Sequence, residues 1–215
     1  INGGDGNDTI VDRWGDDTIE GGAGDDVIVD EAGSNTIRGG NGNDRITISD
    51  IYSLPASTIG NPRRTNLIEG GAGNDWVSIG RLPIGSLTVD LGEGDDILEL
   101  TSLISADGVY RLGTGRDTVV LTYEYGDGVR GSLNILTLAD FTAGDAGDIL
   151  NLGEAVRGIF SSPTIFAAFD GANPFANGVL RLVQDGADTL IQIDYDGAKG
   201  TVVAPFTIIR LQNVT

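Results

Sequence analysis

The chain of 215 residues contains no cysteine, no histidine and no methionine. The absence of cysteine excludes disulfides and thiolate metal or redox sites. The absence of histidine excludes imidazole-based catalytic triads and removes the commonest transition-metal ligand. No apolar run approaches the ~18 residues that a membrane span needs, so no membrane insertion is expected. The first residues show no signal-peptide pattern either.

Positive charge is also scarce. The chain has 13 Lys and Arg residues against 32 Asp and Glu residues, which gives a formal net charge of -19. This balance disfavours nucleic acids and anionic membrane surfaces as partners. It favours cations, because crowded carboxylates need a counter-charge.

Glycine, in contrast, is abundant, with 34 residues, and it recurs within a nine-residue unit. The unit reads Gly-Gly-x-Gly-x-Asp-x-aliphatic-x, and its residues are called positions 1 to 9 below. Full copies stand at 3–11, 21–29, 39–47 and 70–78. Looser copies stand at 91–99 and 112–120, where Leu91 and Leu112 replace the first glycine.

The aliphatic residue at position 8 forms a periodic stripe. Its members are Ile10, Ile19, Ile28, Ile37 and Ile46, followed by Val77, Leu98 and Val119. Such spacing predicts short strands that each bury one side chain. The full and looser units recur at intervals of 18, 18, 31, 21 and 21 residues, which indicates rungs of two strands and two turns. Strong turns, those of the full and looser units, then lie on one edge, and weak turns and insertions lie on the other.

The sequence therefore predicts an all-β protein. Residues 1–120 are expected to form a parallel β-roll (a β-solenoid), with a surface-loop insertion at 48–69. Residues 121–215 are expected to form a β-rich C-terminal cap. Within the cap we expect short helices at 153–170, a hairpin at 179–196 and a last strand at 206–214.

Calcium is the cation that the repeat favours, because it takes six to eight oxygen ligands from carboxylates and carbonyls. One turn cannot supply six ligands, so ions are expected between stacked turns, about five in all. The expected contributors are Gly3, Asp5, Gly6, Asp8, Gly21, Ala23, Gly24, Asp26, Gly39, Asn41, Gly42, Asp44, Gly70, Ala72, Gly73, Asp75, Gly94, Asp96 and Asp117. For the weak turns, with Asp12, Asp16, Asp17 and Asp30, solvated charge is favoured over calcium.

The copies GGDGNDTIV, GGAGDDVIV and GGNGNDRIT resemble the repeats-in-toxin (RTX) family. This resemblance implies a parallel β-roll with calcium between its turns. It also implies export from Gram-negative bacteria by a type I secretion system, whose machinery would be a partner. The segments LTLADFTAGDAGDILNL and IQIDYDGAKG resemble the C-terminal target regions of such secreted proteins.

No constellation of catalytic residues stands out, so the chain itself is not expected to be an enzyme. Ile1 and Asn2 fit positions 8 and 9 of a preceding unit, which suggests a piece of a longer protein. The leading hypothesis is a calcium-binding module that folds on export. It would serve as the C-terminal secretion and stabilising domain of a larger secreted bacterial protein. The alternative is the terminal part of a calcium-rigidified surface-layer or adhesin protein.

Overall fold

The computed structural model describes residues 1–49, 64–80, 85–101, 107–122, 135–152, 173–176, 178–194 and 204–215. These residues form strands and turns, and no helix occurs among them. Accordingly, the described part of the chain contains no helix suited to crossing a membrane. The helices predicted at 153–170 fall outside the described residues.

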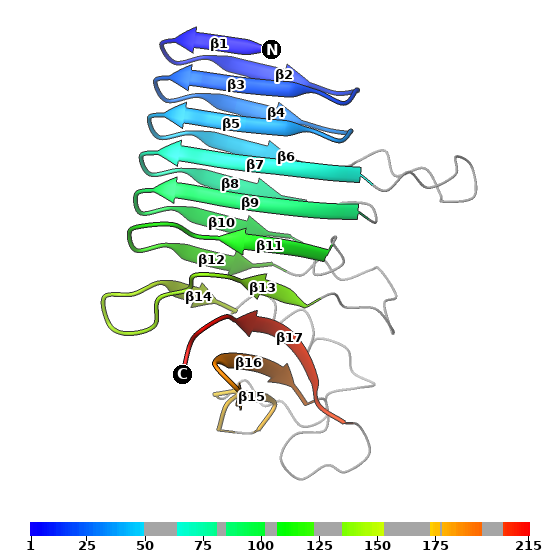
Figure 1. Ribbon diagram of the computed structural model, residues 1–215, viewed down its shortest axis with the longest axis vertical. Helices are drawn as coiled ribbons and strands as arrows, with labels where there is room; N and C mark the ends of the chain where they lie inside the picture. Colours follow the sequence, from blue (N-terminus) through cyan, green and yellow to red (C-terminus); the bar gives the residue numbers. More distant parts are fainter. Residues whose placement is uncertain are drawn as a thin grey trace, which may run out of the picture.

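Successive strands alternate between two stacked sheets, so that two strands make one rung of a roll (Figure 1). One sheet contains β1 (Asn2–Asp5), β3 (Thr18–Ala23), β5 (Thr36–Asn41), β7 (Arg64–Ala72), β9 (Gly85–Glu93), β11 (Asp107–Arg111) and β13 (Leu136–Leu138). The other contains β2 (Thr9–Asp12), β4 (Val27–Asp30), β6 (Arg45–Ile48), β8 (Trp76–Ile79), β10 (Ile97–Leu100), β12 (Thr118–Leu121) and β14 (Ile149–Asn151). All neighbours within these two series pair in parallel.

The register places equivalent repeat positions side by side, which confirms the predicted parallel β-roll. Ile10 pairs with Ile28, and Ile28 pairs with Ile46, each one rung further along. Every residue of the predicted position 8 stripe is buried in the core between the sheets. Because burying one such side chain contributes about 1.5–3 kcal/mol, the stripe supplies a large share of the driving force for stacking.

The long insertion is shorter than the sequence suggested. β6 ends at Ile48 and β7 begins at Arg64, so both ends of the predicted 48–69 loop belong to strands. β6 ends and β7 begins on the edge opposite the strong turns. Residues 50–63 are outside the described part of the chain.

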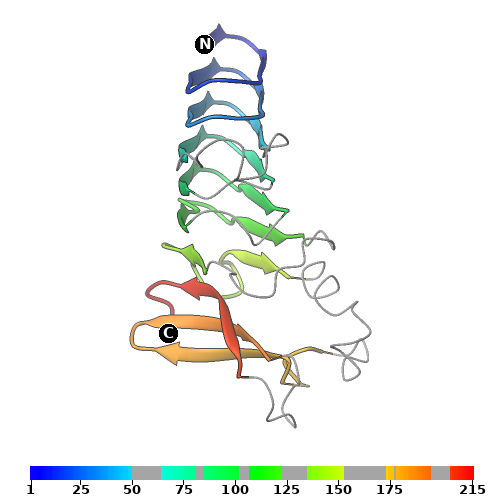
Figure 2. The same cartoon turned by 90° about the vertical axis from the view of Figure 1, so that its right-hand side faces the viewer.

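The parallel pairing continues beyond residue 120. β13 and β14 add a further rung below β11 and β12. β17 (Phe206–Leu211) then pairs in parallel with β13, and β16 (Asp188–Ile193) and β15 (Leu180–Asp185) follow in antiparallel order (Figure 2). The predicted hairpin and last strand are thus present, and they extend the sheet of β1.

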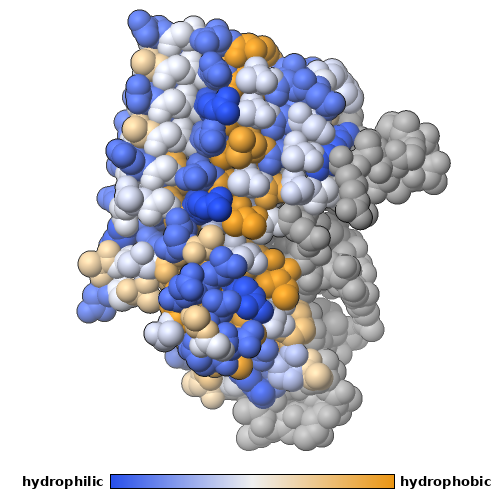
Figure 3. All heavy atoms as spheres, viewed as in Figure 1, coloured by the Kyte–Doolittle hydropathy of each residue, from blue (hydrophilic) through white to orange (hydrophobic). Residues whose placement is uncertain are grey.

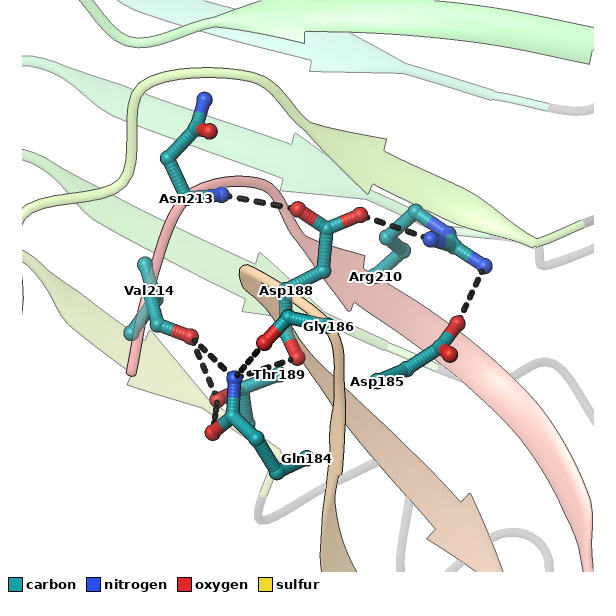
Figure 4. Close-up of polar contacts among 8 residues, drawn as sticks. All are labelled: Gln184, Asp185, Gly186, Asp188, Thr189, Arg210, Asn213 and Val214. Atoms are coloured by element: carbon teal, nitrogen blue, oxygen red, sulfur yellow. Dashed lines mark hydrogen bonds and ion pairs between the residues drawn. The ribbon is translucent and has the colours of Figure 1, made fainter.

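Polar contacts attach the C-terminal residues to this hairpin (Figure 4). The Arg210 guanidinium lies 2.6 Å from Asp188 Oδ2 and 3.2 Å from Asp185 Oδ2. The Asn213 amide N–H donates to Asp188 Oδ1 at 2.9 Å. This bond is the main cause that lowers the pKa of Asp188, and the contact with Arg210 is the second. The Thr189 hydroxyl donates to the Val214 carbonyl at 2.7 Å.

The outer face of the longer sheet bears a column of hydrophilic side chains beside a less polar column (Figure 3). Within it, Arg38 Nη1 lies 3.6 Å from Glu20 Oε1, and Arg38 Nε lies 2.5 Å from Glu69 Oε2. On the other sheet, the Arg45 guanidinium lies 3.2 Å above the Trp76 ring. Such exposed contacts contribute little stability each, but both depend on the correct register.

Candidate metal centre

The strong turns join the two sheets along one edge, at the left of Figure 1. We call this the aspartate edge, formed by turns 6–8, 24–26, 42–44, 73–75, 94–96 and 115–117 and the position 1 residues before them. Glycine is required at positions 2 and 4. In the second turn, Gly22 has φ 123° and Gly24 has φ 124°. A Cβ on Gly22 would lie 2.0 Å from the carbonyl oxygen of Gly4 in the preceding rung.

The six predicted aspartates at position 6 form a hydrogen-bonded ladder along this edge. In each case the backbone N–H of one aspartate donates to Oδ1 of the aspartate in the next rung. The distances are 2.7 Å for Asp8 to Asp26, 2.8 Å for Asp26 to Asp44, 2.8 Å for Asp44 to Asp75, 2.7 Å for Asp75 to Asp96 and 2.9 Å for Asp96 to Asp117. The structure therefore brings these residues together as predicted.

A second ladder runs beside the first in the opposite direction. Here the backbone N–H at position 5 donates to the side chain of the preceding rung, as from Asp25 to Asn7 Oδ1 at 2.9 Å and from Asn43 to Asp25 Oδ1 at 2.7 Å. Each turn is thus bonded to the rungs on both sides. This accounts for the Asn and Asp residues at position 5.

The other carboxylate oxygen of each position 6 aspartate has no partner. Oδ2 is buried and accepts no hydrogen bond in Asp8, Asp26, Asp44, Asp75, Asp96 and Asp117. The last five of these residues are only 1–2% exposed. A buried carboxylate without a counter-charge is costly, because burial removes its hydration. A row of such atoms therefore suits cation binding, because a bound cation would offset this cost.

Glycine at position 1 leaves a small space beside each orphaned oxygen. A Cβ on Gly21 would lie 2.4 Å from Asp26 Oδ2 and 2.5 Å from the carbonyl oxygen of Gly39. We call this space a cradle. Equivalent cradles are bounded by Asp8 Oδ2 and Gly21 O, by Asp44 Oδ2 and Gly70 O, and by Asp75 Oδ2 and Leu91 O, at 2.3–2.6 Å from the absent Cβ.

The cradles end where leucine replaces glycine. Leu91 and Leu112 occupy position 1 in the fifth and sixth units, and both side chains are fully buried. Each places a Cβ where the glycine rungs leave space. The edge therefore contains four glycine cradles followed by two rungs that carry a buried leucine at position 1.

Burial dominates the acidity of these carboxyl groups. Burial raises the pKa of Asp75 to about 7 and the pKa values of Asp96 and Asp117 to about 6, from an ordinary value of 3.8. It also raises the pKa of Asp44. Backbone N–H donors lower all four pKa values, and neighbouring aspartates raise them. Bound cations would remove this penalty, because they stabilise the charged form.

The remaining predicted ligands lie at positions 3 and 4. The carbonyls of Ala23, Asn41 and Ala72 accept the N–H groups of Gly6, Gly24 and Gly42 at 2.6–2.8 Å. Glu93 O and Thr114 O likewise accept from Gly73 and Gly94 at 2.7–2.8 Å. These carbonyls retain a second lone pair for a metal. Asp5 is exposed at the end of β1.

Two further aspartates of this edge escaped the sequence prediction. Asp148 Oδ1 accepts the Asp117 N–H at 3.0 Å, so the ladder gains a seventh member. Asp140 accepts the N–H groups of Leu112 and Gly113 at 2.8 and 3.1 Å. The signal was present, since Asp148-Ile149-Leu150 repeats Asp96-Ile97-Leu98. The turn before Asp148 is longer than the other strong turns, so this segment does not fit the nine-residue unit.

The opposite edge is arranged differently. Asp16 is exposed, as solvated charge requires, but Asp30 is only 1% exposed. Asn35 Nδ2 donates to Asp30 Oδ2, and Asn35 Oδ1 accepts the Asp17 N–H at 2.8 Å. Later rungs place buried aliphatic residues at the position of Asp30, namely Ile48, Ile79, Leu100 and Leu121.

The donor set of the aspartate edge fits calcium. All its candidate ligands are oxygens, and calcium–oxygen distances are about 2.3–2.6 Å. Among the described residues, no three acidic side chains converge closely enough to hold a metal alone. Each cradle instead combines one carboxylate with backbone carbonyls from two rungs.

Comparison with protein families gives one match. The model of the RTX calcium-binding nonapeptide repeat matches the chain in four copies, over residues 1–28, 20–47 and 64–79. These residues include the first four strong turns and their aspartates. Searches of curated proteins and of solved structures gave no match.

Proposed function

Because the chain carries RTX calcium-binding nonapeptide repeats, we propose that it folds around a row of calcium ions on entering a calcium-rich compartment. The observation that supports this most directly is the row of buried, unpartnered Oδ2 atoms on the aspartate edge. Four glycine cradles give four ions between the first five rungs. We therefore propose four ions in place of the about five that were expected from six strong turns.

Electrostatics make folding conditional on the metal. Stacked rungs are ~4.8 Å apart, and two carboxylates at that distance repel by about 3 kcal/mol at an effective dielectric constant near 20. A site with a dissociation constant of ~0.1 mM adds about 1.4 kcal/mol at ~1 mM calcium, and four sites add about 6 kcal/mol. This is comparable with the ~5–15 kcal/mol stability of a typical domain.

A calcium titration followed by far-UV circular dichroism tests this function. The β signal is expected to be small in chelator and to rise to its full value at about millimolar calcium. A full signal in chelator that calcium leaves unchanged would contradict the proposal. The ions per folded chain are counted in parallel by isothermal titration calorimetry.

The variant Asp44→Asn sharpens the test, with Asp25→Asn as its matched control. The amide side chain keeps an Oδ1 that accepts the Asp26 N–H, but it loses the negative ligand at Oδ2. We expect one ion fewer and a loss of about 1.4 kcal/mol at ~1 mM calcium. Asp25→Asn removes the same charge from an exposed position and keeps the Asn43 N–H bond. Equal effects of both variants would indicate general charge repulsion instead of a site.

We further infer that this module is the C-terminal secretion and stabilising domain of a larger secreted bacterial protein, exported by a type I system. Proteins with this repeat are generally secreted. A chain that stays unfolded at low calcium suits passage through a narrow exporter, and the absence of cysteine removes any need for disulfide formation. Fractionation checks the inference. We expect exporter-dependent recovery in the culture medium, whereas retention on washed cells would favour the surface-layer or adhesin alternative.

A further inference from the structure

β15 is the last strand of the longer sheet, so one side of its backbone has no neighbouring strand in the described part of the chain (Figure 2). Two large apolar side chains on this strand are exposed, Leu182 at 61% and Val183 at 36%. Proteins commonly protect such edges from other chains with a short strand, a proline, a lysine or a bulge. β15 has six residues, pairs with β16 in a regular register and contains neither proline nor lysine. It therefore has the features of an edge that accepts a further strand.

The pairing with β16 decides which backbone groups of β15 point outward. Hydrogen-bonded pairs alternate along an antiparallel ladder, and the Asp194 N–H donates to the Val179 carbonyl at 2.8 Å. Every second residue after Val179 therefore bonds to β16, and the residues between, Leu182 and Gln184, direct their backbone groups away from it. Leu180 points the same way, but its N–H already donates to a carbonyl of the preceding turn at 3.0 Å. The outward N–H groups of Leu182 and Gln184 are thus left for a further strand.

These outward groups are complementary to those of an identical strand. Two β15 strands can run antiparallel with a two-fold axis at Val183. Leu182 of each copy then lies opposite Gln184 of the other, and the two residues exchange hydrogen bonds. The same register places Arg181 opposite Asp185 of the second copy and Val183 opposite its own equivalent. Opposite charges and apolar side chains that face each other across two strands stabilise their pairing.

The charges of this edge also suit a second copy. Arg181 pairs with Asp194, and Asp185 pairs with Arg210, within one chain. Pairing of two β15 strands would join these ion pairs into networks across the axis. The edge is therefore locally balanced, although the whole molecule, with a formal net charge of -19, repels its copies over most of its surface.

We propose that β15 pairs with β15 of a second copy of this chain and so continues the longer sheet across a two-fold axis. The axis lies at Val183 and not at Leu182, because the register centred on Leu182 would need the Leu180 N–H, which is already donated. One pair of six-residue strands buries less than the ~1,200 Å² of a stable interface, so the dimer is weak.

The oligomeric state of the full chain, folded in calcium, tests this pairing. Sedimentation velocity between ~10 μM and ~1 mM is expected to show a monomer that converts to a dimer as the concentration rises. Amide hydrogen exchange followed by NMR tests the register. The N–H groups of Leu182 and Gln184 are expected to gain protection with dimerisation, whereas the Val183 N–H, which faces β16, is protected at every concentration. A monomer throughout, or a dimer in which the first two groups still exchange freely, would overturn the proposal.

The variant Val183→Lys tests the position of the axis. Two like charges would face each other there, so the dissociation constant of the dimer is expected to increase ~10-fold or more. Val109→Lys is the matched control, because Val109 is 40% exposed but lies on β11, an interior strand of the same sheet. It is expected to leave the dissociation constant unchanged. A dimer that Val183→Lys does not weaken would overturn the proposal, and far-UV circular dichroism verifies that both variants are folded.

Discussion

At the scale of single residues, we propose that position 1 decides whether a rung has room for an ion. Glycine there leaves a space bounded by a carboxylate oxygen and a carbonyl oxygen, as beside Gly21. Leu91 and Leu112 carry buried side chains at the same position. We infer that leucine in place of glycine at position 1 replaces a contact that depends on the metal with a hydrophobic contact. The hydrophobic contact stabilises the fold at any calcium concentration.

The variant Leu91→Gly is therefore expected to create an additional calcium site next to Asp96. Loss of the buried side chain costs about 2–5 kcal/mol in chelator. Calcium is expected to restore about 1.4 kcal/mol of this at ~1 mM. Denaturant unfolding at several calcium concentrations above the folding midpoint, extrapolated to zero calcium, together with an ion count, measures both effects.

Leu98→Gly is the control, because Leu98 is equally buried in the same rung but lies at position 8. It is expected to lose similar stability in chelator and to gain no ion. If Leu91→Gly also gains none, glycine at position 1 is not what admits the metal.

The sequence predicted the residues of the aspartate edge but not the different roles of their Oδ1 and Oδ2 atoms. Asp44 was assigned as a ligand from its spacing alone, and the structure places it between Asp26 and Asp75 as predicted. That Oδ1 serves the ladder while Oδ2 is left for a metal depends on the stacking distance between rungs. A linear repeat does not specify that distance.

At the scale of elements, the aspartate edge behaves as one column of coupled carboxyl groups. The ladder links Asp8 to Asp148 without interruption, although the spacing between members varies from 18 to 31 residues. Sequence counting lost Asp148 because the turn between β13 and β14 is longer than the others. Only the pairing of β12 with β14 reveals its place.

This column predicts an unusual dependence on pH. Without metal, burial raises the pKa of Asp75 to about 7 and those of Asp96 and Asp117 to about 6, above the ordinary 3.8. The folded chain then binds more protons than the unfolded chain between these values. In chelator, its free energy of unfolding is therefore expected to fall as pH rises from about 4 to about 7.

Calcium reverses the preference, because metal binding requires deprotonated carboxylates. The stabilisation that a given calcium concentration adds is expected to shrink as pH falls below about 7, because protons compete with calcium for the same carboxylates. The far-UV circular dichroism signal in chelator at several pH values, which reports the folded fraction, and calcium titrations at the same values measure the two trends. Apo stability that rises with pH across this window would show that the carboxyl groups are not buried in the metal-free fold.

At the scale of the whole molecule, the periodic spacing of the position 8 residues was sufficient to predict the roll. Short strands that each bury one aliphatic residue bury it most readily by stacking on one another. Ile10, Ile28 and Ile46 confirm this. The periodic spacing could not predict contacts between segments that are distant in the chain. The parallel pairing of β17 with β13 joins residues about 70 positions apart in the chain, and nothing in either strand alone specifies that partner.

The similarity of the rungs also creates a danger of misalignment. A chain that skipped one rung would still bury isoleucine against isoleucine and would still align its aspartates, so the core alone barely distinguishes the two arrangements. The contacts of Arg38 with Glu20 and Glu69, and of Arg45 with Trp76, exist only in the correct alignment. These weak surface pairs thus help to select the correct alignment of the rungs. Their loss is expected to produce a mixture of differently aligned rolls and to change the melting temperature little.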